Sequence, residues 1–447
     1  MSRLLVSGGV VHTPEGAGPW DVLLDRGQIA ALLPPGSGPG GVPVLDAGGC
    51  HVLPGVIDPH VHFREPGLEH KEDWEHGSAA AVAGGVTTVL DMPNTRPPVT
   101  GPAELAAKAR LIAGRSHCHY GLYGMLASGN ADQVVGLCGA GAIGLKVFLG
   151  ESTASLPPPD DGELLGAWRQ TALLGLRTAV HAENGAILSA AAHWASEVRN
   201  LAGHGLSRPA IAEVEATSRA CLLAEHSRAP ILIVHLSTAG SVGAVREAKR
   251  RGVDVRGETC PQYLLLTEAE VIGQGGLGKV NPPIRHDEDR QALWEGIADG
   301  TIDQIGSDHA PHTPEEKGAG ADPFGLELGR VSSGFAGVQT LLPLLLSEAG
   351  KGRLSLERVV QLTAEGPARN WGLWPRKGRI APGADGDLAI VRMGQPVAPP
   401  SALGRNPQSP FSGWSWGAEV TATIVGGRFA YQGGRIVGRP RGEWVRR

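Results

Sequence analysis

The chain has 447 residues, a net charge of −5, and acidic and basic residues interspersed along its length, which argues against a nucleic-acid-binding surface. Its start lacks the apolar core of a signal peptide, no apolar run is long enough to span a membrane, and its five cysteines show no Cys-x-x-Cys spacing. These features predict a soluble cytoplasmic protein with reduced cysteines and with neither a nucleic-acid nor a membrane partner.

The first part of the chain, residues 1–51, reads as short strands separated by turns. Apolar runs of strand length occupy 4–6, 10–11, 21–24 and 29–32, and clusters of Gly, Pro and Asp separate them. No helix fits this part.

Between residues 52 and 365 the pattern changes to eight short apolar runs that alternate with helical stretches. The predicted strands are 53–58, 86–91, 119–124, 142–148, 176–181, 230–235, 253–258 and 303–308, and the clearest helices are 102–113, 210–226, 241–251 and 287–298. Eight such alternations predict an α/β fold, a (β/α)8 TIM-like barrel. An open doubly wound sheet is the alternative, and the lack of Gly-x-Gly-x-x-Gly after a strand disfavours it.

After residue 366 the chain returns to strands. Gly426-Gly427 separates two apolar runs, 418–425 and 428–431, as a hairpin turn does. We expect this tail to pair with the N-terminal strands in one small β-sandwich built from both chain ends. The predicted divisions are therefore 1–51, 52–365 and 366–447.

Polar residues sit where the predicted barrel strands end. Parallel strands of a barrel end at one rim, which is where barrel enzymes place their chemistry. Side chains at i and i+2 of a strand share one side, so the first two histidines can bind one divalent metal, most often Zn. The residues at this rim are His60, His62, Lys146, His181, His235 and Asp308.

Amide hydrolysis needs a strong nucleophile and a sink for oxyanion charge, and two neighbouring divalent metals supply both. Such a pair needs a ligand that bridges it. Lys146 lies among apolar residues, so it is either paired with an acidic residue of the rim or converted by CO2 to a carbamate with two bridging oxygens. Asp308 could be a metal ligand, a general base, or both; a helix-capping role is weakened by Pro311 and Pro314.

The motifs resemble those of the cyclic amidohydrolases of the amidohydrolase superfamily, and most closely dihydroorotases. The resemblance covers nearly the whole chain. It is carried by Pro54-Gly-Val-Ile-Asp-Pro-His-Val-His-Phe-Arg-Glu-Pro-Gly67, by Ser307-Asp-His-Ala-Pro-His312, and by 70–73, 83–88, 92–97, 145–150, 181–184, 235–238 and 281–285.

The resemblance implies two Zn²⁺ ions bridged by carbamylated Lys146, although Mn and Co suit the same ligands. His60, His62 and Asp308 would hold the more buried ion, and His181 and His235 the other. Asp308 would also be the catalytic proton shuttle. The resemblance also implies a substrate-binding set, which includes side chains that bind a substrate carboxylate. Its members are Arg64, Asn94, Asn281 and His312.

The implied reaction is reversible hydrolysis of dihydroorotate to N-carbamoyl-aspartate, a step of pyrimidine biosynthesis. Residues 208–209, 258–261 and 337–340 also resemble allantoinases, but Arg64 together with Asn94 favours dihydroorotase. Many bacterial dihydroorotases replace the bridging lysine by Asp, whereas this chain keeps Lys146, and many allantoinases carry His where this chain has Gln262. The alternatives are an allantoinase or hydantoinase-type enzyme and a non-catalytic barrel subunit, which would have gaps in the ligand set.

Two connections are candidates for mobility. Residues 151–161 follow the lysine strand and, by analogy with relatives, form either a lid over the substrate or a Pro-rich surface connection. Residues 318–334 are the second candidate. The resemblance also implies a homo-oligomer, a dimer or tetramer, that acts on a small-molecule substrate.

Overall fold

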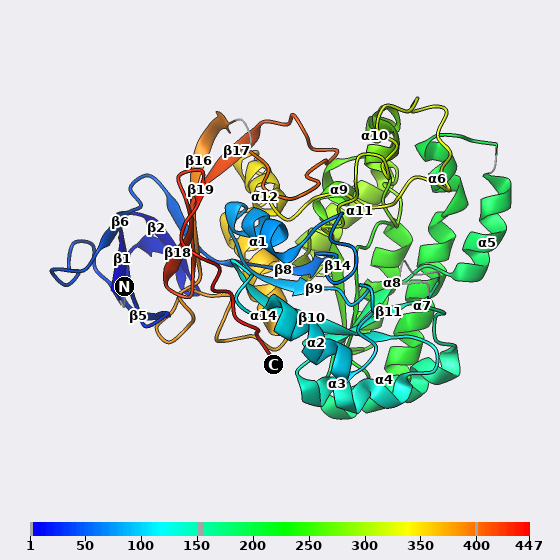
Figure 1. The fold of residues 1–447 in the computed structure, drawn as a ribbon, viewed down its shortest axis with the longest axis horizontal. Helices are drawn as coiled ribbons and strands as arrows, with labels where there is room; N and C mark the ends of the chain where they lie inside the picture. Colours follow the sequence, from blue (N-terminus) through cyan, green and yellow to red (C-terminus); the bar gives the residue numbers. More distant parts are fainter. Residues whose placement is uncertain (1–2, 151–155, 196, 398–400) are drawn as a thin grey trace.

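The barrel is a parallel sheet of eight strands in sequential order (Figure 1). The computed structural model describes residues 3–150, 156–195, 197–397 and 401–447. A parallel bridge between Val61 and His309 joins the last strand to the first, so the ring closes. The predicted (β/α)8 barrel is confirmed. Its strands are β8 Val56–Val61, β9 Val86–Asp91, β10 His119–Leu126, β11 Gly144–Phe148, β12 Thr178–His181, β13 Ile231–Ile233, β14 Val255–Thr259 and β15 Gln304–Ile305.

Helices surround this ring, and the four helices predicted most clearly are all present. Side-chain caps start several of them: Asp73 accepts a hydrogen bond from the His76 amide, and Asp160 forms a capping box with Glu163. The helices are α1 Trp74–Ala83, α2 Pro102–Ile112, α3 Val134–Ala140, α4 Asp161–Leu174, α5 Gly185–Trp194, α6 Leu201–Ser207, α7 Ala210–Ser227, α8 Ala239–Arg250, α9 Pro261–Leu265, α10 Glu268–Val271, α11 Asp287–Ala298, α12 Leu341–Gly350, α13 Leu356–Val360 and α14 Gly366–Asn370.

Both chain ends build the smaller β-sandwich, as predicted, at one end of the molecule (Figure 1). Its four-stranded sheet has the order β5-β4-β1-β6, and its seven-stranded sheet the order β19-β18-β17-β16-β7-β2-β3. The strands are β1 Arg3–Ser7, β2 Val10–Thr13, β3 Gly16–Pro19, β4 Asp21–Asp25, β5 Gln28–Leu33, β6 Val44–Asp46, β7 His51–Pro54, β16 Leu388–Val397, β17 Trp416–Val425, β18 Arg428–Gln432 and β19 Arg435–Ile436. Gly426 and Gly427 turn between β17 and β18 with φ of 53° and 72°, which confirms the predicted hairpin.

The predicted strand 53–58 is wrong, because the apolar run contains two strands in different sheets. β7 pairs with β16 of the sandwich, whereas β8 pairs with β9 of the barrel. Gly55 separates them where the chain passes close to Thr87: a Cβ there would lie 2.2 Å from Thr87 Oγ1. The division into 1–51, 52–365 and 366–447 remains a prediction.

The barrel interior is filled by apolar side chains below the rim. Trp371, which follows α14, packs edge-to-face on Tyr123 of β10, and Ile57 and Leu90 belong to the same cluster. Gly144, at the start of β11, lies against this plug: a Cβ there would be 2.5 Å from the Trp371 ring and 2.9 Å from the Arg177 carbonyl oxygen.

Gly144→Ala is therefore expected to destabilise the protein by about 1–3 kcal/mol, the usual cost of overpacking a close-packed core. Gly166, inside α4, is the matched control, because nothing lies within 4 Å of its Cβ position. Gly166→Ala is expected to stabilise by about 0.5–1 kcal/mol through helix propensity. Urea unfolding measures both changes, and equal effects of the two substitutions would contradict the packing described.

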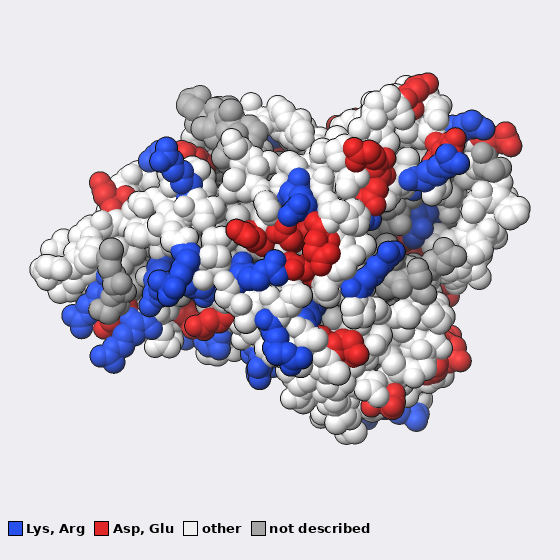
Figure 2. Space-filling model, in the orientation of Figure 1, with Lys and Arg blue, Asp and Glu red and all other residues white. Residues whose placement is uncertain are grey.

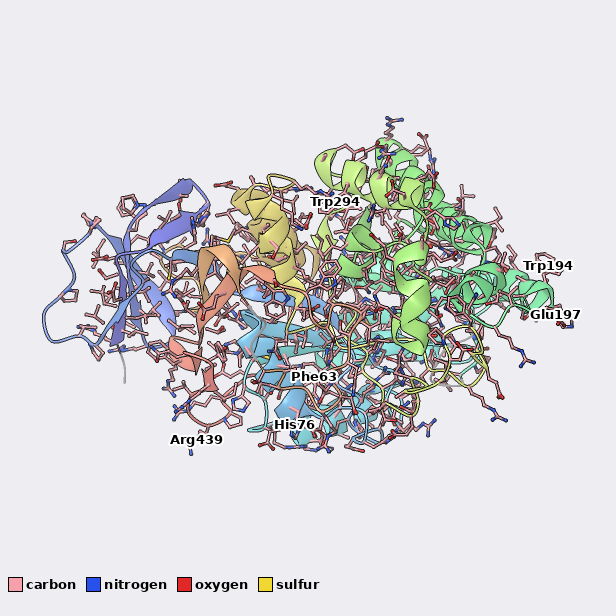
Figure 3. All side chains as sticks on the ribbon, turned by 90° about the horizontal axis from the view of Figure 1, so that it is seen from above. Phe63, His76, Trp194, Glu197, Trp294 and Arg439 are labelled. Carbon is pink, nitrogen blue, oxygen red and sulfur yellow. The ribbon has the colours of Figure 1, made fainter. Side chains whose placement is uncertain are left out.

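The outer surface carries both signs of charge. Figure 2 shows a group of acidic side chains near the middle of one face, over α1, with basic side chains around it. Figure 3 places Arg439 at the sandwich end and the exposed Trp194 at the opposite end of the barrel. None of the helices in the described part of the chain is long and apolar enough to cross a bilayer.

Candidate metal centre and active site

All six side chains predicted at the rim line one cavity. His60 lies in β8, Lys146 in β11 and His181 at the end of β12, while His62, His235 and Asp308 come just after their strands. Three of the four predicted substrate-binding residues, Arg64, Asn94 and Asn281, line the same cavity. The exception is His312, which lies against the Arg64 side chain.

His60, His62 and Asp308 offer ligand atoms that all lie within 4.8 Å of one another. The Nε2 atoms of both histidines are 3.3 Å from Asp308 Oδ1. The His235 ring lies nearby, with centroids 5.5 Å from His60 and 4.6 Å from His181. Residues that are far apart in sequence thus meet at one mouth of the barrel.

Burial keeps these imidazoles neutral, the form that binds metal. It lowers the pKa of His60 to about 3 and lowers the pKa of His62, His181 and His235 from the ordinary value. Protonated rings would be poor ligands, so the low pKa suits a metal centre.

A second set of side chains fixes which ring nitrogen carries the proton. His60 Nδ1 lies 2.8 Å from Glu258 Oε1, and His62 Nδ1 donates to Asn94 Oδ1 at 2.9 Å. The Nε2 electron pair of His62 therefore faces the Asp308 oxygen without a proton between them. This arrangement is repulsive unless a cation is shared, and so it fits a metal ion.

His181 is held in the same way from its other nitrogen. Its Nε2 donates to Glu183 at 2.8 Å, and Arg208 pairs with the same carboxylate, which leaves Nδ1 for a ligand. In His235 the Nδ1 atom is buried and has no hydrogen-bond partner in the described residues. Sequence reasoning missed the orienting roles of Glu183 and Glu258, although both lie inside motifs that it singled out.

The surroundings of Lys146 are unusual for a charged lysine. It is 1% exposed, and within the described ranges its amine makes neither a hydrogen bond nor an ion pair; its contact is the Phe148 ring, 4.9 Å away. Asp308 and Glu258 act on the amine electrostatically, but neither forms an ion pair with it in the described residues. Burial lowers the Lys146 pKa to about 8, which raises the fraction of neutral amine that CO2 can carbamylate.

Backbone strain also gathers at the cavity. Arg64, His235 and Asp308 have positive φ, of 65°, 40° and 49°. Such conformations cost about 1–3 kcal/mol each and persist where the surroundings impose them, often at functional sites.

Arg64 is a buried cation without a carboxylate partner among the residues described. Its Nε donates to the Pro311 carbonyl at 3.3 Å and its Nη2 lies 3.1 Å from His312 Nε2. Burial lowers the Arg64 pKa to about 10, so it stays charged at neutral pH. The nearby Asn281 Oδ1 is also buried and unpartnered in this part of the chain. Both groups are suited to bind a polar ligand.

The two candidate mobile connections differ in what the structure shows. Residues 151–155 of the proposed lid lie outside the described residues; in the rest of it, Leu156 packs against the cluster of Met125, Ala127 and Phe148. The 318–334 connection is tied down, because Lys279 Nζ donates to the carbonyls of Leu328 and Val331 at 2.6 Å.

Comparison with known proteins identifies the family of this chain. The model of the amidohydrolase family matches residues 51–430. The allantoinase of Deinococcus radiodurans is 39% identical over 99% of this chain and 98% of its own length. The dihydroorotase of Geobacter sp. (strain M21) is 35% identical over 97% of this chain and 100% of its own length.

Among solved structures, the L-hydantoinase (dihydropyrimidinase) from Arthrobacter aurescens superposes with a TM-score of 0.95 and 31% identity, with 100% of both chains covered. The expected superfamily is thus confirmed. The finer dihydroorotase expectation is not, because allantoinase and hydantoinase relatives support the alternative better. The chain belongs to the amidohydrolase family and is a hydrolase.

Proposed function

We propose that this enzyme is a zinc-dependent cyclic amidohydrolase that opens a C–N bond in a small ureide ring of the allantoin or hydantoin class. The names of its relatives favour this ring class. The observation that carries the metal-dependent chemistry is Lys146, a fully buried amine without a polar partner in the described chain, among four neutral histidines.

In this proposal His60, His62 and Asp308 would hold one ion, His181 and His235 would hold the other, and carbamylated Lys146 would be the shared ligand. Bound zinc would lower the pKa of a water and polarise the ring carbonyl. The chain's own part is to orient and to move a proton. Glu258, Asn94 and Glu183 hold the three rings in place, and the Asp308 carboxylate accepts a proton and returns it to the departing nitrogen.

Dihydroorotate is the second candidate substrate, and Arg64 is the observation that favours it. A guanidinium that is buried, charged and free of protein carboxylates can form a two-pronged contact with a substrate carboxylate. Allantoin and hydantoin lack that group. Assembly as a dimer or tetramer and a cytoplasmic location complete the proposal.

Arg64→Gln separates the two candidates. If the substrate carries a carboxylate, kcat/KM for it should fall by about 10²–10³-fold, because a buried charge-assisted contact is lost. Hydrolysis of an uncharged ring should change far less. Steady-state kinetics on both rings measures this, with zinc content as the control for an intact metal site.

A substrate panel tests the proposal itself. Zinc-loaded enzyme is incubated with allantoin, hydantoin, dihydrouracil and dihydroorotate, and ring opening is followed by loss of ring absorbance. We expect turnover of at least one ring, with allantoin or hydantoin first. If the protein retained well below one zinc ion per chain after loading and opened none of the rings, the result would instead support the non-catalytic barrel.

A further inference from the structure

The connection between β16 and β17 does not behave like a hairpin loop. These strands are antiparallel neighbours, which loops of about 2–5 residues usually join. Here residues 398–415 separate them in the sequence, and the described part of this segment, residues 401–415, extends from the sandwich over the barrel (Figure 1). We call residues 401–406 the latch.

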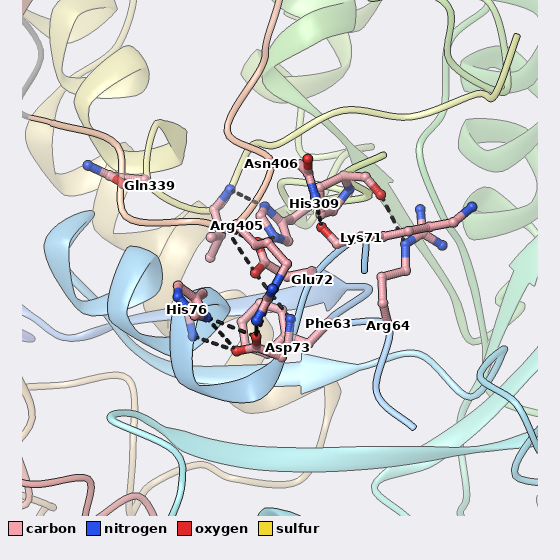
Figure 4. A network of polar contacts seen from close by, with 12 residues as sticks. Phe63, Arg64, Lys71, Glu72, Asp73, His76, His309, Gln339, Arg405 and Asn406 are labelled. Carbon is pink, nitrogen blue, oxygen red and sulfur yellow. Dashed lines mark hydrogen bonds and ion pairs between the residues drawn. The ribbon is translucent and has the colours of Figure 1, made fainter. Parts of the chain in front are cut away.

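The latch binds the barrel through paired hydrogen bonds from Gln339. Its Nε2 donates to the Ser401 carbonyl at 3.1 Å, and its Oε1 accepts from the Leu403 amide at 3.0 Å. The next contacts come from Arg405, whose amide donates to Glu72 Oε1 at 3.1 Å. The Arg405 Nε donates to Asp73 Oδ2 at 2.9 Å (Figure 4).

Two further residues fit the latch to the loop before α1. Asn406 Nδ2 donates to the carbonyl oxygens of His70 and Lys71, at 3.0 and 2.7 Å. Gly404 allows the close approach, because a Cβ there would lie 2.9 Å from Glu72 Oε2. The latch therefore holds residues 70–73 by both backbone and side chains.

One route of contacts leads from the latch to the metal ligands. Glu72 is fully buried, and its Oε2 lies 3.4 Å from His309 Nε2. His309 Nδ1 accepts from the amides of Gly337 and Val338, so the proton is on Nε2, facing Glu72. The His309 carbonyl accepts from the His62 amide at 2.7 Å, and His309 directly follows Asp308 in the chain.

A second route leads to the buried arginine of the cavity. Lys71, whose carbonyl the latch holds, places its Nζ 3.2 Å from His312 Nδ1 and 2.8 Å from Glu316. The other nitrogen of His312 is the one that lies beside Arg64. The metal ligands and Arg64 are thus both connected to residues 70–73, which the latch contacts.

We propose that the latch is a positioning element of the active site. Arg405 and Asn406 contact none of the proposed metal ligands. Through Glu72 and His309 they fix the positions of His62 and Asp308, and through Lys71 and His312 they fix the position of Arg64. The inference rests on the proposed hydrolytic function of the cavity. It assigns a catalytic consequence to a segment contributed by the β-sandwich.

The alternative is that the latch only fastens the two parts of the molecule together. The two roles are separable, because the Arg405 side chain is 43% exposed and such ion pairs add little to stability. A positioning role predicts loss of catalysis with nearly unchanged unfolding. A fastening role predicts unchanged catalysis and a lower unfolding temperature.

The test compares Arg405→Ala with Arg405→Lys. The matched control is Arg392→Ala, which removes the exposed Arg392–Glu419 pair between β16 and β17. Arg405→Ala keeps the amide contact to Glu72 but releases Asp73, the next residue in the chain. We expect this to lower kcat by about 10–100-fold, as loss of an outer-shell support does, with a smaller change in KM. Arg405→Lys should recover much of the loss, because the charge opposite Asp73 remains. Arg392→Ala should leave kcat unchanged.

A second readout does not depend on turnover. Zinc release from the loaded protein to a chelating dye should be several-fold faster in Arg405→Ala, because His62 and Asp308 are less firmly held. Gly404→Ala, which pushes on Glu72, should act in the same direction. Unchanged kcat and zinc release, with a lower unfolding temperature, would overturn the proposal. If the unmodified enzyme opens no ring of the panel, the proposed function fails, and zinc release still decides whether the latch acts on the metal ligands.

Discussion

Lys146→Met is expected to reduce kcat by about 1,000-fold or more, because several kcal/mol of metal-dependent transition-state stabilisation is lost with the bridge. Zinc content should fall below two ions per chain. Compared with the unmodified protein, both metal-free, the variant should stay folded and unfold at the same or a higher temperature, because the substitution removes a buried amine without a hydrogen-bond or ion-pair partner in the described chain.

Lys108 is the matched control for this prediction. It is also a buried lysine, 2% exposed, but its Nζ lies 2.5 Å from Asp91 and donates to the Met92 carbonyl. Lys108→Met leaves a buried charge unpaired and should destabilise the protein by about 3–5 kcal/mol. Thermal unfolding, metal analysis and kcat are measured for both. A strongly destabilised Lys146→Met protein with most of its activity would contradict a functional role for that lysine.

Asp308→Asn is expected to lower kcat by about 10²–10⁴-fold, the usual contribution of a positioned acid–base group. The amide is similar in size to the carboxylate, so the backbone at φ 49° should be retained. The amide can neither accept the proton nor balance the positive charge of a metal ion bound beside His60 and His62. The loss should lie in kcat rather than KM, because proton transfer belongs to the chemical step.

Asp254→Asn, at an exposed ion pair with Arg177, is the control and should leave kcat unchanged. If Asp308→Asn kept kcat within a few-fold of the unmodified enzyme at all pH values, Asp308 would not be the proton shuttle.

The barrel and its rim could be predicted from the sequence because both signals are local. Strand–helix alternation fixes the architecture, and a residue at the end of a parallel strand reaches the same rim as every other strand end. Thus Lys146 and Asp308 could be placed together although they are distant in sequence. The confirmed superfamily resemblance rests on these same motifs.

Other features depend on contacts that the sequence does not display. A continuous apolar run hid the change of sheet at Gly55, because β7 and β8 differ in their partners and not in composition. No sequence spacing pairs the Glu258 carboxylate with the His60 ring, although the two are in contact in the structure. The latch joins Arg405 to Asp73 across most of the chain, a distance at which no sequence spacing applies.

The substrate was harder to predict than the chemistry. Arg64 and Asn94 suggested a carboxylate clamp, yet Asn94 uses its amide oxygen to hold His62, a role that any substrate requires. The allantoinase relative is also more similar than the dihydroorotase relative. The proposed role of Arg64 in ring specificity is therefore what the Arg64→Gln kinetics must decide.

A titration of metal-free protein with zinc in bicarbonate buffer, with ring opening followed at each step, tests the central claim most directly. The account predicts no turnover without zinc and a rate that rises until two ions are bound per chain. Full activity in the metal-free protein, or no ring opening at any zinc level, would contradict it.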